Sequence, residues 1–239
     1  MYRLTLAVPE TRVAQHYFGH DLPVGDRVAL YNLGAEDQVC AIMCRDHERP
    51  RPDLMRVWWD ASAQGGTTPS PLLIDSEDVA EHPRFQDAYR HRRCLFPVSG
   101  WFAWQRSDRT QPAQPWYFTL ADPGQDEVLF LAGLWQYTGE GITVRAGLLT
   151  EPANSEFATV CTRQPLTIDP EARWDWLDPG KTDPASVRDA TRRLAPSRLV
   201  AYPVGDGIGK TGPGKSRGPD LIEPLDGRRI ASTQDNEEV

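Results

Sequence analysis

The segment Gly209–Ser216, GKTGPGKS, has residue types at a spacing that suggests phosphate chemistry. It matches G-x-x-x-x-G-K-[ST], in which backbone amides cradle phosphates, the lysine reaches them and the hydroxyl holds Mg²⁺. Those roles would fall to Lys215 and Ser216. The preceding RLVAYPV can supply the required strand, but the glycine and proline of the following RGPDLIEP disfavour the required helix. The alternative is a glycine-rich surface loop whose lysines, Lys210 and Lys215, add positive charge beside a phosphate backbone.

A second chemically suggestive segment is Arg90–Trp104, RHRRCLFPVSGWFAW. Arginines beside aromatic residues can form a nucleic-acid surface, since bases stack on aromatic rings. The same residues are equally consistent with two core strands that follow a helix, because arginines in a last turn suit the helix dipole. Ala103 stands between Phe102 and Trp104 in this run.

Metal chemistry has weaker support in the sequence. His16 and His20 have the i, i+4 spacing of helical metal ligands, but no second motif completes a site. Cys40 and Cys44 would lie on one face of a strand, and unpaired cysteines usually behave as small buried hydrophobes. We therefore expect no metal and no cofactor.

Composition bounds the class of protein. The chain has 239 residues, a formal net charge of −8, 21 prolines and 19 glycines. A nucleic-acid-binding domain is usually basic, so the bulk charge argues against one but permits a local basic face. No segment has the length of apolar residues needed for a membrane helix or the pattern of a signal peptide. We expect a soluble, cytoplasmic protein with free thiols.

Short runs rich in β-branched and aromatic residues dominate the chain, which predicts an α+β fold with a mostly antiparallel, β-rich domain over residues 1–225. The polar segment 226–239 predicts a disordered tail. Helices are expected at Glu10–Phe18, Asp78–Arg90 and after Asn154, and the pairs Asp169-Pro170 and Asp183-Pro184 predict further helix starts. The predicted strands are Val28–Leu33, Gln38–Cys44, Met55–Trp59, Cys94–Val98, Trp101–Gln105, Trp116–Ala121, Glu127–Trp135, Ile142–Thr150 and Leu199–Val204.

Several segments in order resemble one family. They are SEDVAEHPRFQDAYRHRRCLFPVSGWFAW, PWYF, LAGLW, LLTEPAN, TRQPL and YPVGDGIG. Their order and spacing, across about residues 1–225, resemble the SOS-response-associated peptidase (SRAP) family. The resemblance implies a β-rich fold around a barrel-like sheet with peripheral helices. It also implies binding to single-stranded DNA and a covalent link to abasic sites.

The sequence departs from the family pattern at each place that the resemblance implies is catalytic. Tyr2 replaces the nucleophilic cysteine that follows the initiator methionine. Leu73 replaces the asparagine of the Asn-Ala-Arg-Ala-Glu motif, Ala103 replaces the glutamate of the Gly-aromatic-aromatic-Glu-Trp motif, and Cys161 replaces the histidine before Asp-Arg. Glu77 and Arg163 are retained from these motifs.

These replacements predict that the family's covalent chemistry is lost. A tyrosine offers no thiol for the thiazolidine that the family forms with the sugar aldehyde. Its bulk predicts that Met1 is retained, and the Met1 α-amine could form only a reversible imine. Leu73 and Ala103 cannot transfer protons. Cys161 would be a nucleophile only as a stabilised thiolate, and the alternative is a buried thiol.

DNA contact is predicted to be weakened but retained in part. Asp75 replaces an arginine of the family's DNA contacts and so reverses a charge that would face phosphate. The remaining candidates for DNA contact are aromatic or basic: Trp58, Trp59, Arg84, Arg163, Lys210 and Lys215. The sequence thus predicts a non-crosslinking SRAP-like protein with weak single-stranded DNA binding. A non-catalytic interaction or scaffold protein and a nucleotide-binding protein that uses Gly209–Ser216 are the alternatives.

Overall fold

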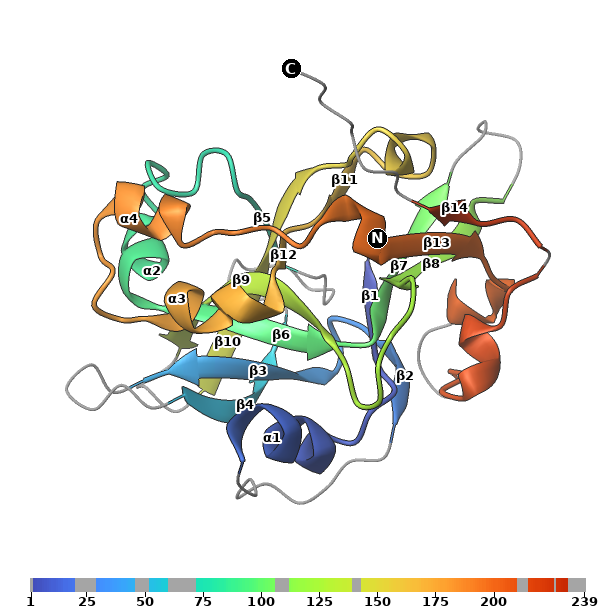
Figure 1. Cartoon of the computed structure of the whole chain (residues 1–239), viewed down its shortest axis with the longest axis horizontal. Coiled ribbons are helices and arrows are strands. Elements are labelled where there is room, and N and C mark those ends of the chain that lie inside the picture. Colours follow the sequence, from blue (N-terminus) through green and yellow to red (C-terminus); the bar gives the residue numbers. More distant parts are fainter. Residues whose placement is uncertain are drawn as a thin grey trace.

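The structure is a computed structural model, and it describes residues 2–19, 29–45, 52–59, 72–105, 112–138, 143–209, 215–225 and 227–231, with the backbone alone for Phe18. Two β-sheets form the body of the molecule. Three short helices, α2, α3 and α4, lie on the left of the view in Figure 1, and α1 lies at its lower edge. This arrangement agrees with the α+β class that the sequence predicts.

The first sheet carries the N-terminal strand. Its described strands pair antiparallel in the order β14-β13-β8-β7-β1-β2. Their bounds are β1 (Arg3–Leu6), β2 (Leu30–Leu33), β7 (Gly100–Gln105), β8 (Gln114–Leu120), β13 (Leu199–Pro203) and β14 (Ile230–Ala231).

The second sheet follows the order β11-β10-β4-β3-β6-β9-β12, and β5 pairs with β10. Strand β10 also pairs with β9, so β4, β3, β6, β9 and β10 form a closed ring of pairings. The pairings of β10 with β4 and β5 are parallel, and the others are antiparallel. The bounds are β3 (Gln38–Cys44), β4 (Pro52–Trp58), β5 (Leu73–Asp75), β6 (Arg93–Val98), β9 (Leu129–Thr138), β10 (Thr143–Pro152), β11 (Arg163–Pro165) and β12 (Thr167–Ile168).

The helices are short, as the many prolines predict. The α-helices are α1 (Glu10–Phe18), α2 (Gln86–His91), α3 (Arg173–Leu177) and α4 (Pro184–Asp189). The 3₁₀ turns are η2 (Phe157–Thr159), η3 (Pro170–Ala172), η4 (Pro196–Arg198), η5 (Asp206–Gly209) and η6 (Pro219–Ile222). The predicted caps are present: Asp169 and Asp183 accept hydrogen bonds from the backbone at the starts of η3 and α4, and Asn154 accepts one from Phe157 N.

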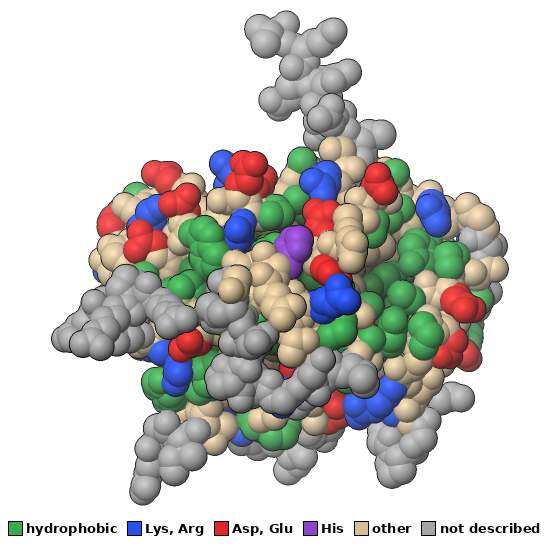
Figure 2. Space-filling view, turned by 60° about the horizontal axis from the view of Figure 1, so that its bottom comes forward, with side chains coloured by type: hydrophobic (Ala, Val, Ile, Leu, Met, Phe, Trp, Pro, Cys, Tyr) green, Lys and Arg blue, Asp and Glu red, His purple; other side chains and the backbone are tan. Residues whose placement is uncertain are grey.

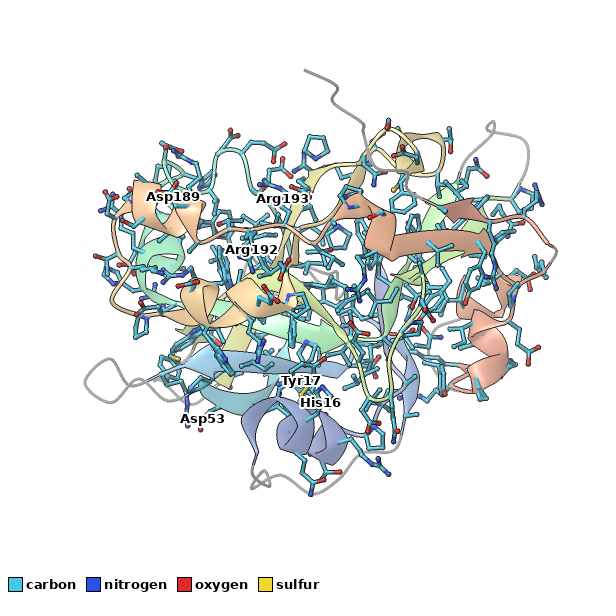
Figure 3. All side chains as sticks on the ribbon, in the orientation of Figure 1. His16, Tyr17, Asp53, Asp189, Arg192 and Arg193 are labelled. Atoms are coloured by element: carbon cyan, nitrogen blue, oxygen red, sulfur yellow. The ribbon has the colours of Figure 1, made fainter. Side chains whose placement is uncertain are left out.

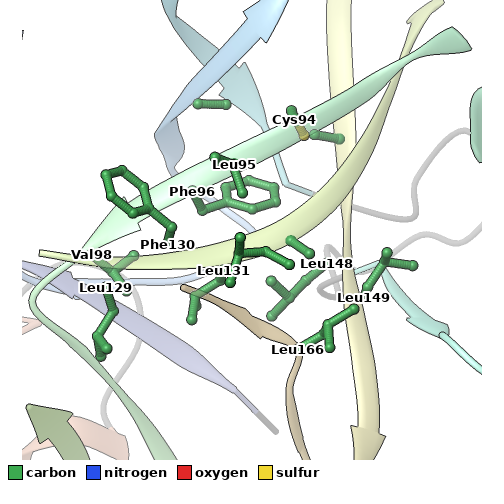
Figure 4. Packing of buried hydrophobic residues seen from close by; sticks show 14 of the residues in the cluster. Cys94, Leu95, Phe96, Val98, Leu129, Phe130, Leu131, Leu148, Leu149 and Leu166 are labelled. Atoms are coloured by element: carbon green, nitrogen blue, oxygen red, sulfur yellow. The ribbon is translucent and has the colours of Figure 1, made fainter. Parts of the chain in front are cut away.

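The main core lies between the strands of the closed ring. Phe96, Phe130, Leu131 and Leu148 are fully buried there, and Figure 4 shows them between β6, β9 and β10. Gly133 makes this packing possible, because a Cβ atom at that position would lie 2.4 Å from the Phe96 ring. A smaller cluster covers the other face of the first sheet: Phe102, Tyr117, Tyr202, Val204, Ile208 and Leu221.

All nine predicted strands are present, with ends shifted by a few residues. The helix predicted over Asp78–Arg90 is wrong in its first half, where the chain forms turns and α2 begins only at Gln86. Pro83 explains the difference, because a proline lacks the backbone N–H and disfavours helical geometry at the residue before it. In the segment predicted to be disordered, Ile230–Ala231 instead pairs with β13, and residues 226 and 232–239 lie outside the described part.

Candidate functional site

Three of the four replaced positions meet at the start of β1. Strand β1 pairs with β7 so that Arg3 lies opposite Phe102, which puts Tyr2 beside Ala103. Cys161 follows the η2 turn and approaches from the other side. Tyr2, Ala103 and Cys161 line a hollow of about 450 Å³, together with Trp104, Ala158, Thr159, Val160, Thr162 and Arg163.

Tyr2 and Cys161, two of the replaced side chains in this hollow, are held in neutral forms. The Tyr2 hydroxyl donates a hydrogen bond to the carbonyl of Arg163. Burial, with a smaller contribution from Cys161, raises the pKa of Tyr2 well above its usual value, although Arg163 opposes the shift. The Cys161 thiol lies 3.9 Å from the Phe157 carbonyl, and burial raises its pKa to about 11. At neutral pH the hollow therefore holds a phenol and a thiol, neither of them ionised.

Leu73, the fourth replaced position, does not line the hollow. It lies on β5 opposite Leu148 of β10, and it is exposed. The same short strand leads to Asp75 and Glu77, whose carboxylates reach the hollow's edge through Arg163. The structure thus connects the Leu73–Glu77 motif to the hollow by an ion pair.

Arg163 is enclosed by acceptors, in an arrangement that we call the arginine clamp: Arg163, Asp75, Glu77 and Thr150. Its Nε lies 3.1 Å from the Asp75 carboxylate, and its two terminal nitrogens lie 2.9 and 2.7 Å from the two Glu77 oxygens. It also donates to the hydroxyl and the carbonyl of Thr150. The hydrogen bonds from Arg163 lower the pKa of Glu77 to about 2, and those to Glu77 raise the pKa of Arg163. One cation and two anions leave the clamp with a net negative charge.

The other candidates for DNA contact differ in their exposure to solvent. Trp58, at the end of β4, is half-buried, whereas Trp59 is fully buried and donates its Nε1–H to the Leu72 carbonyl at 3.3 Å. Arg84 is exposed, with its guanidinium 5.2 Å from the centre of the Phe85 ring. Lys210 lies outside the described residues. Of the two tryptophans, only Trp58 retains exposed surface on which a base could stack.

Lys215, the lysine of the phosphate-loop motif, is also held by carboxylates. We call this cluster the lysine staple: Lys215, Glu36 and Asp37. The lysine side chain is 2% exposed, and its Nζ lies 2.8 Å from Glu36 and 2.5 Å from Asp37. These acids belong to the turn between β2 and β3. Arg3 of β1 also binds Glu36, at 3.1 Å. Most of the motif, residues 210–214, lies outside the described part.

The basic cluster Arg90–Arg93 separates into different environments. Arg90 is exposed, as expected of a helix end, but Arg93 is buried. Its guanidinium donates to the carbonyls of Trp176, Tyr89, Arg90 and Asp178, at 2.5 to 2.9 Å, and burial lowers its pKa to about 10. Arg93 therefore ties α2 to α3. A basic residue just after a helix often binds the last carbonyls of that helix, so the sequence position of Arg93 predicts such contacts. The burial of Arg93 cannot be predicted from the sequence.

The histidines and cysteines that could suggest a metal site do not come together among the described residues. The described residues contain no group of three or more histidine, cysteine or acidic side chains arranged for a metal ion. His16 lies on α1 beside Tyr17 (Figure 3), and His20 is outside the described part. Within the described helices, none is long and apolar enough to span a membrane.

Comparisons with solved structures agree with this architecture. A protein from Bacteroides thetaiotaomicron superposes with a TM-score of 0.71 at 16% identity, over 93% of this chain and 98% of its own. A phage-related protein from Bordetella bronchiseptica gives a TM-score of 0.66 at 20% identity, over 85% of this chain and 94% of its own. At these identities, the likeness establishes the fold.

Sequence relatives and a family model go further. The abasic site processing protein YedK of Escherichia coli is 26% identical over 216 residues, 86% of this chain and 89% of its own. The abasic site processing protein YoqW of Bacillus subtilis is 24% identical over 210 residues, 84% of this chain and 89% of its own. The model of the SOS response associated peptidase (SRAP) family matches residues 2–211. Since this match spans most of the sequence, the chain belongs to the SRAP family.

Proposed function

We propose that this protein is a DNA-damage-associated SRAP protein that does not crosslink to abasic sites and that retains weak binding to single-stranded DNA. The observation that carries the proposal is the hollow at the start of β1, where a phenol, a methyl group and a neutral thiol stand in for the family's reactive side chains. The relatives named above are abasic site processing proteins, so DNA is the partner class considered first.

The chemistry of the hollow supports loss of covalent capture. Formation of a stable adduct with a sugar aldehyde requires a nucleophile and groups that move protons. The Tyr2 hydroxyl is engaged with the Arg163 carbonyl and has a raised pKa. Cys161 is protonated at neutral pH, and Ala103 has no ionisable group. The α-amine of Met1 is then the one remaining candidate of the family mechanism, and an amine alone gives a reversible imine.

The arginine clamp supports weak rather than tight DNA binding. A phosphate that approaches Arg163 meets the carboxylates of Asp75 and Glu77, which lie within 3.1 Å of the guanidinium. Because like charges repel, the clamp opposes a phosphate backbone at the edge of the hollow. The half-buried Trp58 and the exposed Arg84 remain as candidate contacts for an unpaired base and a phosphate.

Incubation with single-stranded DNA that carries an abasic site tests the chemical half of the proposal. The wild-type protein is expected to give no heat-stable shifted band on a denaturing gel, and at most a band that requires borohydride. The matched control restores all four positions at once, as Tyr2→Cys, Leu73→Asn, Ala103→Glu and Cys161→His. A heat-stable band from the wild-type protein would overturn the proposal, and a band from the control alone would support it.

An interaction or scaffold protein is the second candidate function, favoured by the net charge of −8 and by the negative clamp. A titration of labelled single-stranded DNA separates the two. Binding that weakens as salt rises supports the DNA proposal, since each neutralised phosphate contributes a slope of about −0.7 in log affinity against log salt. Absence of binding at low salt favours the interaction protein.

A further inference from the structure

A second hollow lies at the opposite end of β1 and shares no residue with the first. Its volume is about 400 Å³, within the range of small-molecule sites. Ala7 and Val8, which follow β1, line it, whereas Tyr2 at the other end lines the first hollow. The five residue-to-residue steps from Tyr2 to Ala7 span roughly 17 Å at the usual rise of a strand. The second hollow is therefore a separate feature of the fold.

The floor of this hollow is one face of the first sheet. Tyr117 and Thr119 are two residues apart on β8, so their side chains share one face, and the same holds for Val200 and Tyr202 on β13. Thr119 pairs with Val200 and Tyr117 with Tyr202, so all four lie on the same face of the sheet. Gly100 on the neighbouring β7 leaves room for the Tyr117 ring, because a Cβ atom there would lie 2.5 Å from the ring. The sequence thus creates a broad floor that carries hydroxyl groups.

One wall supplies a cation that pairs with no carboxylate of the described residues. Arg229 is exposed and lines the hollow, with its guanidinium 5.7 Å from the centre of the Tyr202 ring. It forms no ion pair with any residue that the structure describes. Burial raises the pKa of Tyr202, although Arg229 opposes the shift, so the hydroxyl stays protonated and able to donate. Ser99 accepts a hydrogen bond from Ala7 N at 2.9 Å, which leaves its own proton available.

The two acids of the lining are already paired with arginines. Asp126 pairs with Arg12 at 3.1 Å, and Glu127 pairs with Arg198 at 2.7 Å. The Thr119 hydroxyl donates to the Ser99 carbonyl at 2.8 Å, so the donors that remain available are the Arg229 guanidinium and the hydroxyls of Tyr202 and Ser99. These groups are donors, and donors around a cation select an anion.

The remaining lining is apolar: Val8, Leu120, Pro123, Val200 and Ile222. Figure 2 shows hydrophobic side chains gathered on the right of the view, the side on which β8 and β13 lie in Figure 1. A ligand that fits both the apolar lining and the donors has an apolar body and one anionic group.

We propose that the hollow between β8, β13 and Arg229 binds a small organic carboxylate with an apolar body. The carboxylate accepts hydrogen bonds from Arg229 and the Tyr202 hydroxyl, and the apolar body covers Val8, Leu120 and Pro123. A free fatty acid and the C-terminal residue of a peptide both present this chemistry. The site does not depend on the proposed DNA function, because the two hollows share no residue.

An NMR titration of protein with labelled Ile, Leu and Val methyl groups tests the proposal. The probes are sodium octanoate for the fatty-acid source, N-acetyl-leucine for the peptide source, and octanol as the uncharged control. We expect saturable shifts of the Val8, Leu120, Val200 and Ile222 methyl groups with at least one carboxylate. Octanol should bind several-fold more weakly, since it lacks the charge that pairs with Arg229.

The matched variants are Arg229→Gln and Arg228→Gln, neighbours of which only the first lines the hollow. Arg229→Gln should weaken carboxylate binding by about two- to fivefold, as expected for an exposed ion pair, and should remove the preference over octanol. Arg228→Gln should leave both unchanged. Absence of saturable shifts with either carboxylate, or equal binding of octanol and octanoate to the wild-type protein, would overturn the proposal.

Discussion

The arginine clamp and the lysine staple have the same composition of charges but differ in their exposure to solvent. In each, one cation that the sequence nominates for phosphate binding is held by two carboxylates, Asp75 and Glu77 in the clamp and Glu36 and Asp37 in the staple. The difference lies in burial, since the Arg163 side chain is 28% exposed and that of Lys215 is 2% exposed. An exposed ion pair can be exchanged for a ligand at small cost, whereas a buried one is part of the fold.

The largest expected effect is the loss of stability when the buried cation is removed. Lys215→Met should lower the free energy of unfolding by about 1–3 kcal/mol, because it removes a buried cation from Asp37 and Glu36, which keep only Arg217 and Arg3 as described partners. Arg163→Met should cost about 1 kcal/mol or less, since its partners remain solvated. Urea unfolding of both variants measures the difference. Equal losses would contradict the assignment of one cation to the fold and the other to the surface.

The exposed clamp should instead control DNA affinity. Asp75→Arg removes a repulsion and adds a cation, so it should tighten single-stranded DNA binding and steepen the salt dependence by about 0.7 per added phosphate contact. The control is Asp189→Arg on α4 (Figure 3), which makes the same change in total charge at another exposed acid. Fluorescence anisotropy at several salt concentrations measures both. The same gain in both variants would show that total charge, not the clamp, sets the affinity.

The strand predictions show what could be inferred from the sequence. The nine predicted strands have β-branched or aromatic runs bounded by turn residues, and those signals are local. The five strands that the sequence left unpredicted have two to four residues: β1, β5, β11, β12 and β14. Such short strands show no usable alternation, and they exist because a neighbouring strand pairs with them. Their absence from the prediction matters, because β1, β5 and β11 position Tyr2, Asp75 and Arg163.

The sequence predicted which positions belong to the site but not which residues contact one another there. The family motifs brought Tyr2, Ala103 and Cys161 into one hypothesis, and the structure places all three around one hollow. The partners of Arg163 and Lys215 were not predictable, since each contact joins segments far apart in the chain. A basic residue within a motif looks the same in the sequence whether its charge faces solvent or a buried carboxylate.

Low pH should weaken the ion pairs of the arginine clamp and the lysine staple, because it protonates Glu77 and Glu36. Burial acts to raise the pKa of Glu36, but hydrogen bonds from Lys215 and Arg3 lower it to about 2, and Arg163 lowers the pKa of Glu77 to about 2. A carboxyl group whose pKa is lowered in the folded state stabilises the fold at pH values above its unfolded-state pKa, near 4.5. This stabilisation is lost as the pH falls toward 2.

Thermal unfolding of Glu36→Gln and Glu77→Gln across this pH range measures the effect. Each variant should be less stable than the wild type at pH 7, and the difference should shrink below pH 4.5. High salt should reduce the Glu77 difference more than the Glu36 difference, because the clamp is the more exposed of the two. A difference that stays constant down to pH 2 would contradict the ion-pair origin.

The smallest expected effect is the response to ATP with Mg²⁺. Nucleotide binding at Gly209–Ser216 would require Lys215 to leave Glu36 and Asp37, its partners at 2.8 and 2.5 Å, and to face solvent. We therefore expect no change in melting temperature. A site filled at a hundred times its dissociation constant would stabilise the fold by about 2.7 kcal/mol, which thermal unfolding detects readily. A saturable rise that Ser216→Ala removes, in a variant that keeps the staple, would show that the lysine exchanges its carboxylates for phosphate.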